Sequence, residues 1–396
     1  MLSFDEAMER VLGVAAPLPH ESVPLERARD RVLAETLRAK TPLPAFDYSA
    51  MDGYAVDTAS FEGEGPFTFT VRGESRTGRP APVLEKRTVC RIFTGAMLPM
   101  GADAVVMQED VRVTGDVARF ERAPHAFSNV RRQGEDLAAS AVALEAGTRL
   151  RPYQLGLVAA LDRNAVVVSH RPRVAILCTG DELRPPGSVA RPASIPESNS
   201  VVIDALARGA GATVTTLSPT SDSLDDTRAK IAAALREHDV LVTIGGVSVG
   251  DYDVVRPALE AEGVALELYK VAIKPGKPLT LGRRGATLVL GLPGNPASAQ
   301  ITFALFGLPL LRRLQGDRAV HRRPRRCRLA APIRQKPGRR GFYAASLDGD
   351  LATPLAGQAS GSTVSLAHAD ALVIVPESSS GYEANDTVEA FVLSDL

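Results

Sequence analysis

The chain has 396 residues, of which 45% are hydrophobic, so we expect roughly two to four domains whose cores need no disulfide or metal. Its 46 basic and 46 acidic side chains give a formal net charge of +0, and tryptophan is absent, which argues against a nucleic-acid partner. No apolar run reaches the length that crosses a membrane, so no membrane partner is expected, and the cysteines, Cys90, Cys178 and Cys327, predict reduced thiols in a cytoplasmic protein.

Two parts of the N-terminal region are predicted to be helical. Ser3 and Glu6 have capping-box spacing, and this stretch has the acidic amphipathic pattern of a helix start, not of a signal peptide. A second helix is expected over Leu25–Ala39. Helical character returns over Leu137–Leu161, with Pro152 at a first-turn position.

The segment between these helical parts predicts a small inserted β-rich domain. Its expected strands are Phe67–Val71, Thr88–Phe93, Ala104–Gln108 and Val117–Phe120. Residues 46–55 are rich in small and acidic residues, which is typical of a functional loop, or of an Asp-Gly turn in which Asp47 and Asp52 bind local backbone donors. Thr94 either caps a helix or directs its hydroxyl at a phosphate, and Asp136 belongs to a charged turn that is either solvated or functional.

From residue 173 the pattern changes to alternating strands and helices, which predicts a parallel sheet with helices on both faces. The expected strands are Arg173–Cys178, Thr213–Leu217, Val240–Ile244 and Thr287–Leu290. The expected helices are Asn199–Arg208, Ser223–Glu237, Tyr252–Ala261 and Ala297–Leu314, the last capped by Asn295 with Pro296 at its first position. Right-handed crossovers place strand-end loops on one rim, so we expect the loops 179–182, 218–222, 245–253 and 291–295 to lie together.

The loop GGVSVGDYD, residues 245–253, is the main candidate ligand site on this rim. Its glycines, Gly245, Gly246 and Gly250, permit a sharp turn and close approach to a ligand, although an ordinary strand-to-helix turn capped by aspartate is the alternative. The carboxylates predicted to share the rim are Asp181, Glu182, Asp222, Asp251 and Asp253. Because Mg²⁺ beside a phosphate site is typically held by carboxylates, the residues favour metal-assisted phosphoryl chemistry on a nucleotide-like ligand.

Two lysines, Lys274 and Lys277, are separated by a Pro-Gly turn that lets both ammonium groups point at one anion, unless the turn is simply solvated. After residue 318 the chain returns to short strands, which predict a small β-barrel or β-sandwich. Those strands are expected at Arg326–Leu329, Gly341–Leu347, Ala371–Pro376 and Thr387–Leu393. The hydroxyl-rich loop 358–363 either serves an oxyanion or is flexible.

Seven motifs, taken together and in order, resemble molybdopterin molybdenumtransferase, the MoeA and gephyrin E-domain family, along the whole chain. They are SAMDGYA (49–55), FTGA (93–96), RRQGED (131–136), TGDEL (179–183), GGVSVGDYD (245–253), AIKPGKP (272–278) and GLPGNPASA (291–299). The resemblance implies insertion of molybdate into adenylylated molybdopterin, with Mg²⁺-dependent cleavage that releases AMP and molybdenum cofactor. It also implies as partners the molybdopterin adenylyltransferase and molybdenum-enzyme chaperones.

The fold class that the resemblance implies is α/β plus β, in an elongated multidomain chain that forms a homodimer. The expected domains are a helical linking and dimerisation domain (1–40 and 138–170), an inserted β-rich domain (41–137), an α/β parallel-sheet molybdopterin-binding domain (171–318) and a C-terminal β-barrel (319–396). The inserted domain of one subunit is expected to face the pterin domain of the other, so the active site is shared between subunits.

Site roles follow from the matched motifs. The implied catalytic residues are Asp52, Thr94 and Asp136 from one subunit and Glu182, Asp222 and Asp253 on the pterin side, with Glu182 and Asp253 also holding Mg²⁺. The implied ligand-binding residues are Gly245, Gly246, Ser248, Gly250, Lys274, Lys277, Pro293, Pro296, Ser360 and Ser362. The chain departs from the family at Tyr48, where asparagine is frequent, and at Ala344, where arginine is frequent. The loss of that guanidinium weakens an expected oxyanion contact.

Two other functions share parts of this pattern. A molybdopterin adenylyltransferase would share the α/β domain and bind ATP directly, but such enzymes need only that unit, whereas this chain has three further domains. A non-catalytic scaffold or cofactor carrier is the second alternative. Retention of the carboxylates and lysines argues against a loss of catalysis.

Overall fold

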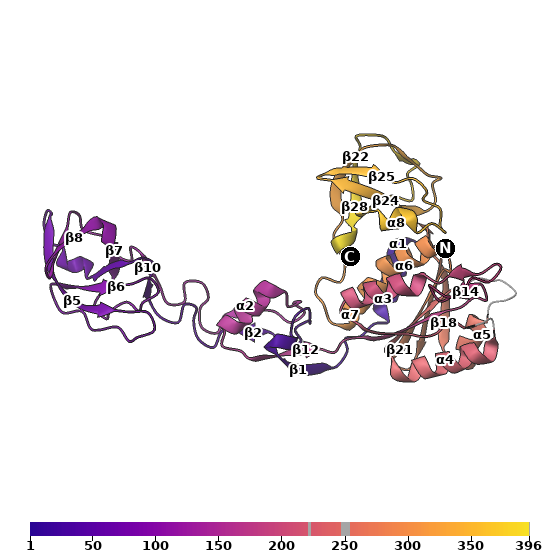
Figure 1. Ribbon diagram of the computed structural model, residues 1–396, viewed down its shortest axis with the longest axis horizontal. Helices are drawn as coiled ribbons and strands as arrows, with labels where there is room; N and C mark the ends of the chain where they lie inside the picture. Colours follow the sequence, from indigo (N-terminus) through magenta and orange to yellow (C-terminus); the bar gives the residue numbers. More distant parts are fainter. Residues whose placement is uncertain (221–222, 247–253, 396) are drawn as a thin grey trace.

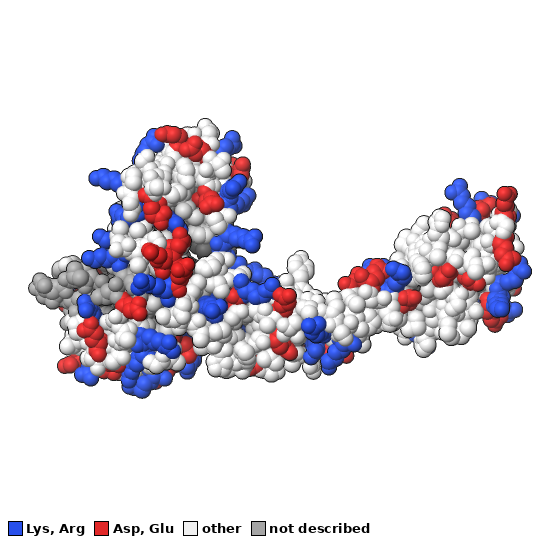
Figure 2. Space-filling view, turned by 180° about the vertical axis from the view of Figure 1, so that it is seen from behind, with Lys and Arg blue, Asp and Glu red and all other residues white. Residues whose placement is uncertain are grey.

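The computed structural model describes residues 1–220, 223–246 and 254–395, and Figure 1 shows that they form an elongated molecule. The inserted β-rich domain lies at one end, the α/β domain and the C-terminal barrel lie together at the other, and the linking segment joins them. On the face seen in Figure 2, basic and acidic side chains are interspersed over both ends. No helix in the described ranges is long and apolar enough to cross a membrane. This arrangement confirms the predicted fold class.

The α/β domain is built on a six-stranded sheet in the order β16-β13-β17-β21-β20-β18. Its parallel strands are β13 (Arg173–Cys178), β16 (Thr213–Thr216), β17 (Val240–Ile244) and β21 (Thr287–Leu292). One face is covered by α3 (Asn199–Gly209), and the other by α4 (Leu224–Glu237) and α5 (Val255–Ala261). Because β17 is buried at every position, its sequence is apolar on both faces, as a central parallel strand requires.

The sheet is not wholly parallel, contrary to the prediction. Two strands that the sequence analysis missed, β18 (Ala265–Lys270) and β20 (Pro278–Arg284), run antiparallel at one edge. The prolines and glycine of the lysine turn indicated a loop, but Pro278 is the first residue of β20, where a missing N–H is tolerated. The lysine turn is therefore held between two strands of the sheet.

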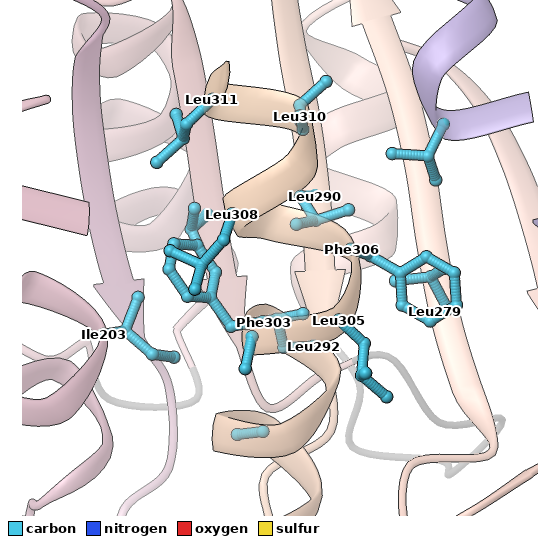
Figure 3. Packing of buried hydrophobic residues seen from close by; sticks show 14 of the residues in the cluster. Ile203, Leu279, Leu290, Leu292, Phe303, Leu305, Phe306, Leu308, Leu310 and Leu311 are labelled. Carbon is cyan, nitrogen blue, oxygen red and sulfur yellow. The ribbon is translucent and has the colours of Figure 1, made fainter. Parts of the chain in front are cut away.

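The predicted buried helix after residue 295 is confirmed, with one irregular stretch. It consists of α6 (Pro296–Thr302), a π-helical segment (Phe303–Gly307) and α7 (Leu308–Leu314). Figure 3 shows Phe303 and Phe306 on this helix, in the same cluster as Leu290 of the sheet, and all three are fully buried. Each such side chain stabilises the fold by roughly 1.5–3 kcal/mol through burial, so the helix is anchored along its length.

The N-terminal helix α1 (Phe4–Gly13) packs against the same core. It begins at the predicted capping box, in which the Glu6 N–H donates to the Ser3 hydroxyl and the Glu6 carboxylate accepts from the Ser3 N–H. The Phe4 ring lies 5.3 Å from that of Phe306 and 5.6 Å from that of Phe342 in the C-terminal domain. The first helix thus stabilises the junction of the α/β domain and the barrel.

The prediction of a helix over Leu25–Ala39 is wrong, and the linking segment is not mainly helical. The chain forms β1 (His20–Pro24), a 3-10 turn and β2 (Leu37–Arg38), which pair with the returning strands β12 (Ala165–Ser169) and β11 (Val142–Leu144). Of Leu137–Leu161, only α2 (Pro152–Ala160) is α-helical, with Pro152 in its first turn as expected. Ala28 and Val32 are buried four residues apart, as are Leu33 and Leu37, but long-range strand pairing overrides that local spacing.

The inserted domain contains all four predicted strands, in a six-stranded sheet ordered β7-β4-β6-β5-β9-β8. Its strands are β4 (Gly53–Val56), β5 (Phe67–Ser75), β6 (Thr88–Ile92), β7 (Ala104–Met107), β8 (Val111–Thr114) and β9 (Val117–Phe120). Residues 46–55, predicted as a loop, instead include β3 (Tyr48–Ser49) and the start of β4. The rings of Phe61, Phe69 and Phe120 pack together in the core of this domain. Asp52 lies in the turn directly before β4.

The C-terminal domain is a small closed barrel. Its strands are β22 (Arg325–Leu329), β24 (Arg340–Asp348), β25 (Leu351–Pro354), β26 (Ala371–Val375) and β28 (Thr387–Val392). The ring closes because β26 pairs with both β24 and β28. A short strand from the α/β domain, β19 (Ile273–Lys274), adds to β24 in parallel, opposite Arg340 and Gly341. The strand that carries Lys274 therefore connects the two domains.

Candidate active site

The carboxyl ends of the parallel strands meet at one rim. The Thr179 N–H donates to the Ile244 carbonyl at 3.1 Å, and the Gly245 N–H donates to the Leu292 carbonyl at 3.1 Å. A β-bridge pairs Thr179 with Thr220 of the adjacent loop. The described parts of the four predicted loops therefore lie together, which confirms the predicted convergence for those residues.

Gly245 occupies a place on this rim that no other residue fits. Its φ is +87°, and a Cβ there would lie 2.9 Å from the Thr179 carbonyl oxygen. Gly246 also has a positive φ, of +62°, so the backbone turns sharply at the strand end as expected. The other predicted residues of these loops, Asp222, Ser248, Gly250, Asp251 and Asp253, lie outside the described residues.

Glu182 lies exposed in the loop that follows β13. This loop is held by a short parallel pairing between β14 (Leu183–Arg184) and β15 (Ile195–Pro196). The Glu182 carboxylate folds over Gly180, since a Cβ on Gly180 would lie 2.5 Å from Oε2. In the part of the chain that the structure describes, no three His, Cys, Asp or Glu side chains are grouped to hold a metal ion.

A pocket of about 500 Å³ opens between this rim and the barrel, and we call it the lysine pocket. The predicted site residues that line it are Lys274, Lys277, Pro293 and Ser360. Gln358, from the predicted loop 358–363, also lines it, as do Arg339 and Tyr343, which the sequence analysis did not place in the site. Pro296 and Ser362 are not among its lining residues. Lys274, Lys277 and Arg339 form no ion pair with any described residue, so their charges are available to an anion.

The turn between the two lysines is fixed against α6. Gly276 has a φ of +108°, and a Cβ on it would lie only 2.2 Å from Oγ1 of the buried Thr302. Glycine therefore lets the turn contact the helix directly. Because the turn cannot shift, the backbones of Lys274 and Lys277 are held at the pocket edge.

Tyr343 supports Lys274 from the barrel side. The Lys274 Nζ lies 5.6 Å from the centre of the Tyr343 ring, a contact that stabilises the ammonium by roughly 0.5–1 kcal/mol at an exposed site. The Tyr343 hydroxyl donates to Gln335 Oε1 at 3.3 Å. Burial raises the pKa of the Tyr343 phenol, against an opposing effect of Arg339, so the phenol stays protonated at neutral pH. Tyr343 thus acts as a donor and a support, not as a base.

Asn295 does not cap α6 with its side chain, which corrects the prediction. It occupies the N-cap position, but its Nδ2 donates instead to the Ser360 hydroxyl at 3.3 Å. The Ala297 N–H donates to the Ser360 carbonyl at 3.0 Å. The hydroxyl loop of the barrel is therefore attached to the start of α6, which places Ser360 at the lysine pocket.

Asp52 and Thr94 form a direct pair in the inserted domain. The Asp52 Oδ1 accepts from the Thr94 N–H at 2.7 Å and from the Thr94 hydroxyl at 2.8 Å. Thr94 thus neither caps a helix nor presents a free hydroxyl. The two hydrogen bonds from Thr94, with a smaller effect of Arg91, lower the pKa of Asp52. The carboxyl group therefore stays ionised at pH values where an ordinary aspartate begins to be protonated. An ionised Asp52 can accept a proton or hold a cation, but it cannot act as an acid at neutral pH.

We expect the Thr94→Val variant to raise the pKa of Asp52 towards its ordinary value, because the hydroxyl donor is lost while the backbone donor remains. The pKa can be measured by NMR titration of the Asp52 carboxyl carbon. Thr88→Val is the matched control, since the Thr88 hydroxyl donates to the Glu85 carbonyl and not to Asp52. An unchanged Asp52 titration in Thr94→Val would contradict this account of the pair.

Asp136 belongs to the same inserted domain but binds locally. Its Oδ1 accepts from Arg131 at 2.6 Å, and the pair is largely exposed, so it contributes little stability. Strand β10 (Val130–Arg131) pairs with β3, which places the charged turn beside residues 46–49. Figure 1 places this whole inserted domain at the opposite end of the molecule from the α/β domain and the barrel, whose residues line the lysine pocket. A single chain therefore does not bring Asp52, Thr94 and Asp136 to the lysines.

Comparisons with known proteins cover nearly the whole chain. Three family models match: the MoeA N-terminal region (domain I and II) over residues 2–161, a probable molybdopterin binding domain over 175–313, and the MoeA C-terminal region (domain IV) over 326–393. The molybdopterin molybdenumtransferase of Haemophilus influenzae is 35% identical over 359 residues, which cover 89% of this chain and 88% of that protein. The enzyme of the same name from Bacillus subtilis is 34% identical over 412 aligned positions, which cover 100% of this chain and 94% of that protein. A solved structure of a molybdopterin biosynthesis moeA protein from Pyrococcus horikoshii is 27% identical, with a TM-score of 0.88. The match covers 99% of this chain and 100% of that one.

Proposed function

Because the chain belongs to the molybdopterin molybdenumtransferase family, we propose that it inserts molybdate into adenylylated molybdopterin and releases AMP and molybdenum cofactor. The lysine pocket is the observation that carries this proposal. There, Lys274 and Lys277 come together from a fixed turn without an acidic partner among the described residues. The reaction binds one oxyanion and breaks a phosphoanhydride, and preorganised cations stabilise both the bound oxyanion and the charge that develops on the leaving AMP.

Each site residue has a role in this proposal. Lys274 and Lys277 bind the oxyanion, and the Ser360 hydroxyl donates to it from the barrel side. The glycine turn at Gly245 and Gly246 leaves the backbone open to the pterin ligand. We assign Ser248 and Gly250 to the same ligand and Asp222 to catalysis, and we assign Pro293, Pro296 and Ser362 to the edge of the site.

Mg²⁺ fits the donor chemistry of the rim. Glu182 presents an exposed carboxylate there, and proteins typically bind Mg²⁺ through one or two carboxylates and several waters. We assign Glu182 and Asp253 to the ion. When bound, it would supply positive charge that polarises the phosphoanhydride.

We further propose a homodimer, in which Asp52, Thr94 and Asp136 of one subunit complete the lysine pocket of the other. The linking helix α2 supports this proposal. Its sequence, PYQLGLVAA, has no charged residue, yet Val158 is its only fully buried position and Tyr153 is 91% exposed. A Cβ on Gly156 would meet nothing within 4 Å, so a second subunit has room to approach. Exposed apolar surface of this kind is typical of protein–protein contacts.

The proposed setting is the cytoplasm. There the protein would receive its substrate from a molybdopterin adenylyltransferase and pass the product to chaperones of molybdenum enzymes. The free cysteines Cys90, Cys178 and Cys327 are buried, and burial raises the pKa of Cys90 to about 11. Such protonated, enclosed thiols are typical of structural cysteines in a reducing compartment.

The proposed function is tested by AMP release. Purified protein is incubated with adenylylated molybdopterin and Mg²⁺, with and without molybdate, and AMP is measured by chromatography. We expect AMP only when molybdate is present. Consumption of ATP with unmodified molybdopterin would instead identify an adenylyltransferase. Tight pterin binding without AMP release would identify a scaffold or carrier.

A further inference from the structure

The lysine pocket is surrounded by cations from two domains. Lys274 and Lys277 come from the α/β domain, while Arg339 immediately precedes β24 of the barrel. Because β19 and β24 run side by side, with Lys274 opposite Gly341, the start of β24 is held next to the lysine strand. Arg339 therefore lines the pocket from a position that the sheet pairing fixes.

Arg339 differs from the arginines around it in having its guanidinium unengaged. Arg340 pairs with Asp5 at 2.9 Å and with Glu377 at 3.1 Å, and Arg334 pairs with Glu383 at 2.7 Å. Arg339 forms no ion pair with any residue in the described ranges. Its carbonyl accepts from Gln335 Nε2 at 3.2 Å, which holds the backbone and leaves the side chain available.

No other guanidinium lines the lysine pocket among the residues that the structure describes. Ala344 faces it without a charge, is 3% exposed, and has its N–H and carbonyl bound to Gln358 at 2.8 and 3.0 Å. The two lysines are compact point charges, whereas a guanidinium presents parallel N–H donors to two oxygens of one anion. Bidentate binding of a tetrahedral oxyanion in this pocket therefore requires Arg339.

A second pocket, of about 450 Å³, adjoins the first. It is lined by Lys274, Arg334, Gln335, Lys336 and Arg339, so it has no carboxylate among its lining residues. Lys274 and Arg339 line both pockets. Arg339 thus lies at the boundary between the two pockets. An anion that enters from the second pocket would contact Arg339 beside the lysines.

We propose that Arg339 is the bidentate ligand of the lysine pocket for a tetrahedral dianion. The identification of that dianion as molybdate rests on the proposed function. In this proposal the Arg339 guanidinium contacts the oxyanion itself. Arg339 therefore neither acts only by supporting the fold nor only adds positive charge to the surroundings.

The test is calorimetric titration of the full-length protein with molybdate, and with sulfate as an unreactive oxyanion, in the absence of pterin. We expect Arg339→Gln to raise the molybdate Kd by roughly 10- to 100-fold, as loss of a charged hydrogen bond predicts. Arg339→Lys keeps the positive charge but lacks the paired N–H donors of the guanidinium, so it should recover only part of the affinity. Arg325→Gln, an exposed arginine on β22 away from the pocket, is the matched control and should bind as the wild type does.

Several results would overturn the proposal: wild-type affinity in Arg339→Gln, full recovery in Arg339→Lys, or no oxyanion binding by the wild type at millimolar concentration. Thermal unfolding of each variant identifies a structural effect, because a merely structural role would lower the unfolding midpoint together with affinity. The proposed function is tested separately. Molybdate binding that depends on Arg339, in a protein that releases no AMP, would refute the function and leave this inference intact.

Discussion

Mixing two inactive variants, Asp52→Asn and Lys277→Met, is expected to restore AMP release to about a quarter of the wild-type rate. Random pairing makes about half of the dimers mixed, and each mixed dimer keeps one intact site of two. The reason is the separation of the two residues, since Asp52 directly precedes β4 of the inserted domain and Lys277 directly precedes β20 of the α/β domain, and these domains lie at opposite ends of the molecule (Figure 1). Each variant alone should be inactive, because Asp52→Asn removes a charge that Thr94 keeps ionised and Lys277→Met removes a cation from the pocket.

The control for this experiment is a mixture of Lys274→Met and Lys277→Met chains. Both changes fall in the same half of the shared site, so mixed dimers contain no intact site and activity should stay at the low level of the single variants. Differently tagged chains, recovered together, establish that the subunits exchange. Exchange without recovery in the Asp52→Asn and Lys277→Met mixture would refute the shared site. A fully active monomer, measured by light scattering, would refute it as well.

The sequence predicted the α/β domain well because its elements depend on local patterns. Strands β13 and β17 lie within the predicted ranges, since a central parallel strand buries both faces and is apolar throughout. The capping box of Ser3 and Glu6 likewise marked the start of α1. Connections of one handedness then placed the strand-end loops on a common rim, so the rim could be predicted without any coordinates.

The linking segment and the sheet edge were not predictable in the same way. Within Leu25–Ala39 some buried residues are spaced four apart, but several backbone hydrogen bonds of this segment go to residues more than a hundred positions later in the chain. The strand β20 begins with a proline and follows a Pro-Gly turn, so its local signal is that of a loop. In both places, long-range pairing decided the structure, and a local pattern does not contain that information.

The candidate site divides along the same line. Lys274, Lys277, Gly245 and Gly246 could be named as candidates because their residue types suit an anion and a tight turn wherever the fold places them. Arg339 and Tyr343 were not placed in the site, because their contribution depends on the pairing of β19 with β24 across two domains. A residue that acts through an interdomain contact has no local signature in the sequence.

Replacement of Lys274 by methionine is expected to lower kcat/KM for molybdate-dependent AMP release by roughly 100-fold, the usual effect of removing one preorganised charge-stabilising donor. Methionine keeps much of the side-chain volume, so the loss reports on the ammonium group. Lys274 is the sensitive position because it lines both basic pockets and lies over the Tyr343 ring. The rate is measured as AMP formed at varied molybdate concentration with saturating adenylylated pterin.

Lys336→Met provides the comparison that decides how the charge acts. Lys336 lines the adjoining groove but not the lysine pocket, so it contributes to the general field around the entrance without contacting a bound oxyanion. If Lys274 acts by direct contact, Lys336→Met should change kcat/KM by about twofold or less, in line with a screened charge near the surface. Equal losses of kcat/KM in Lys274→Met and Lys336→Met would mean that the summed positive charge around the entrance attracts anions without direct contact. The lysine pocket would then lose its assigned role in binding molybdate.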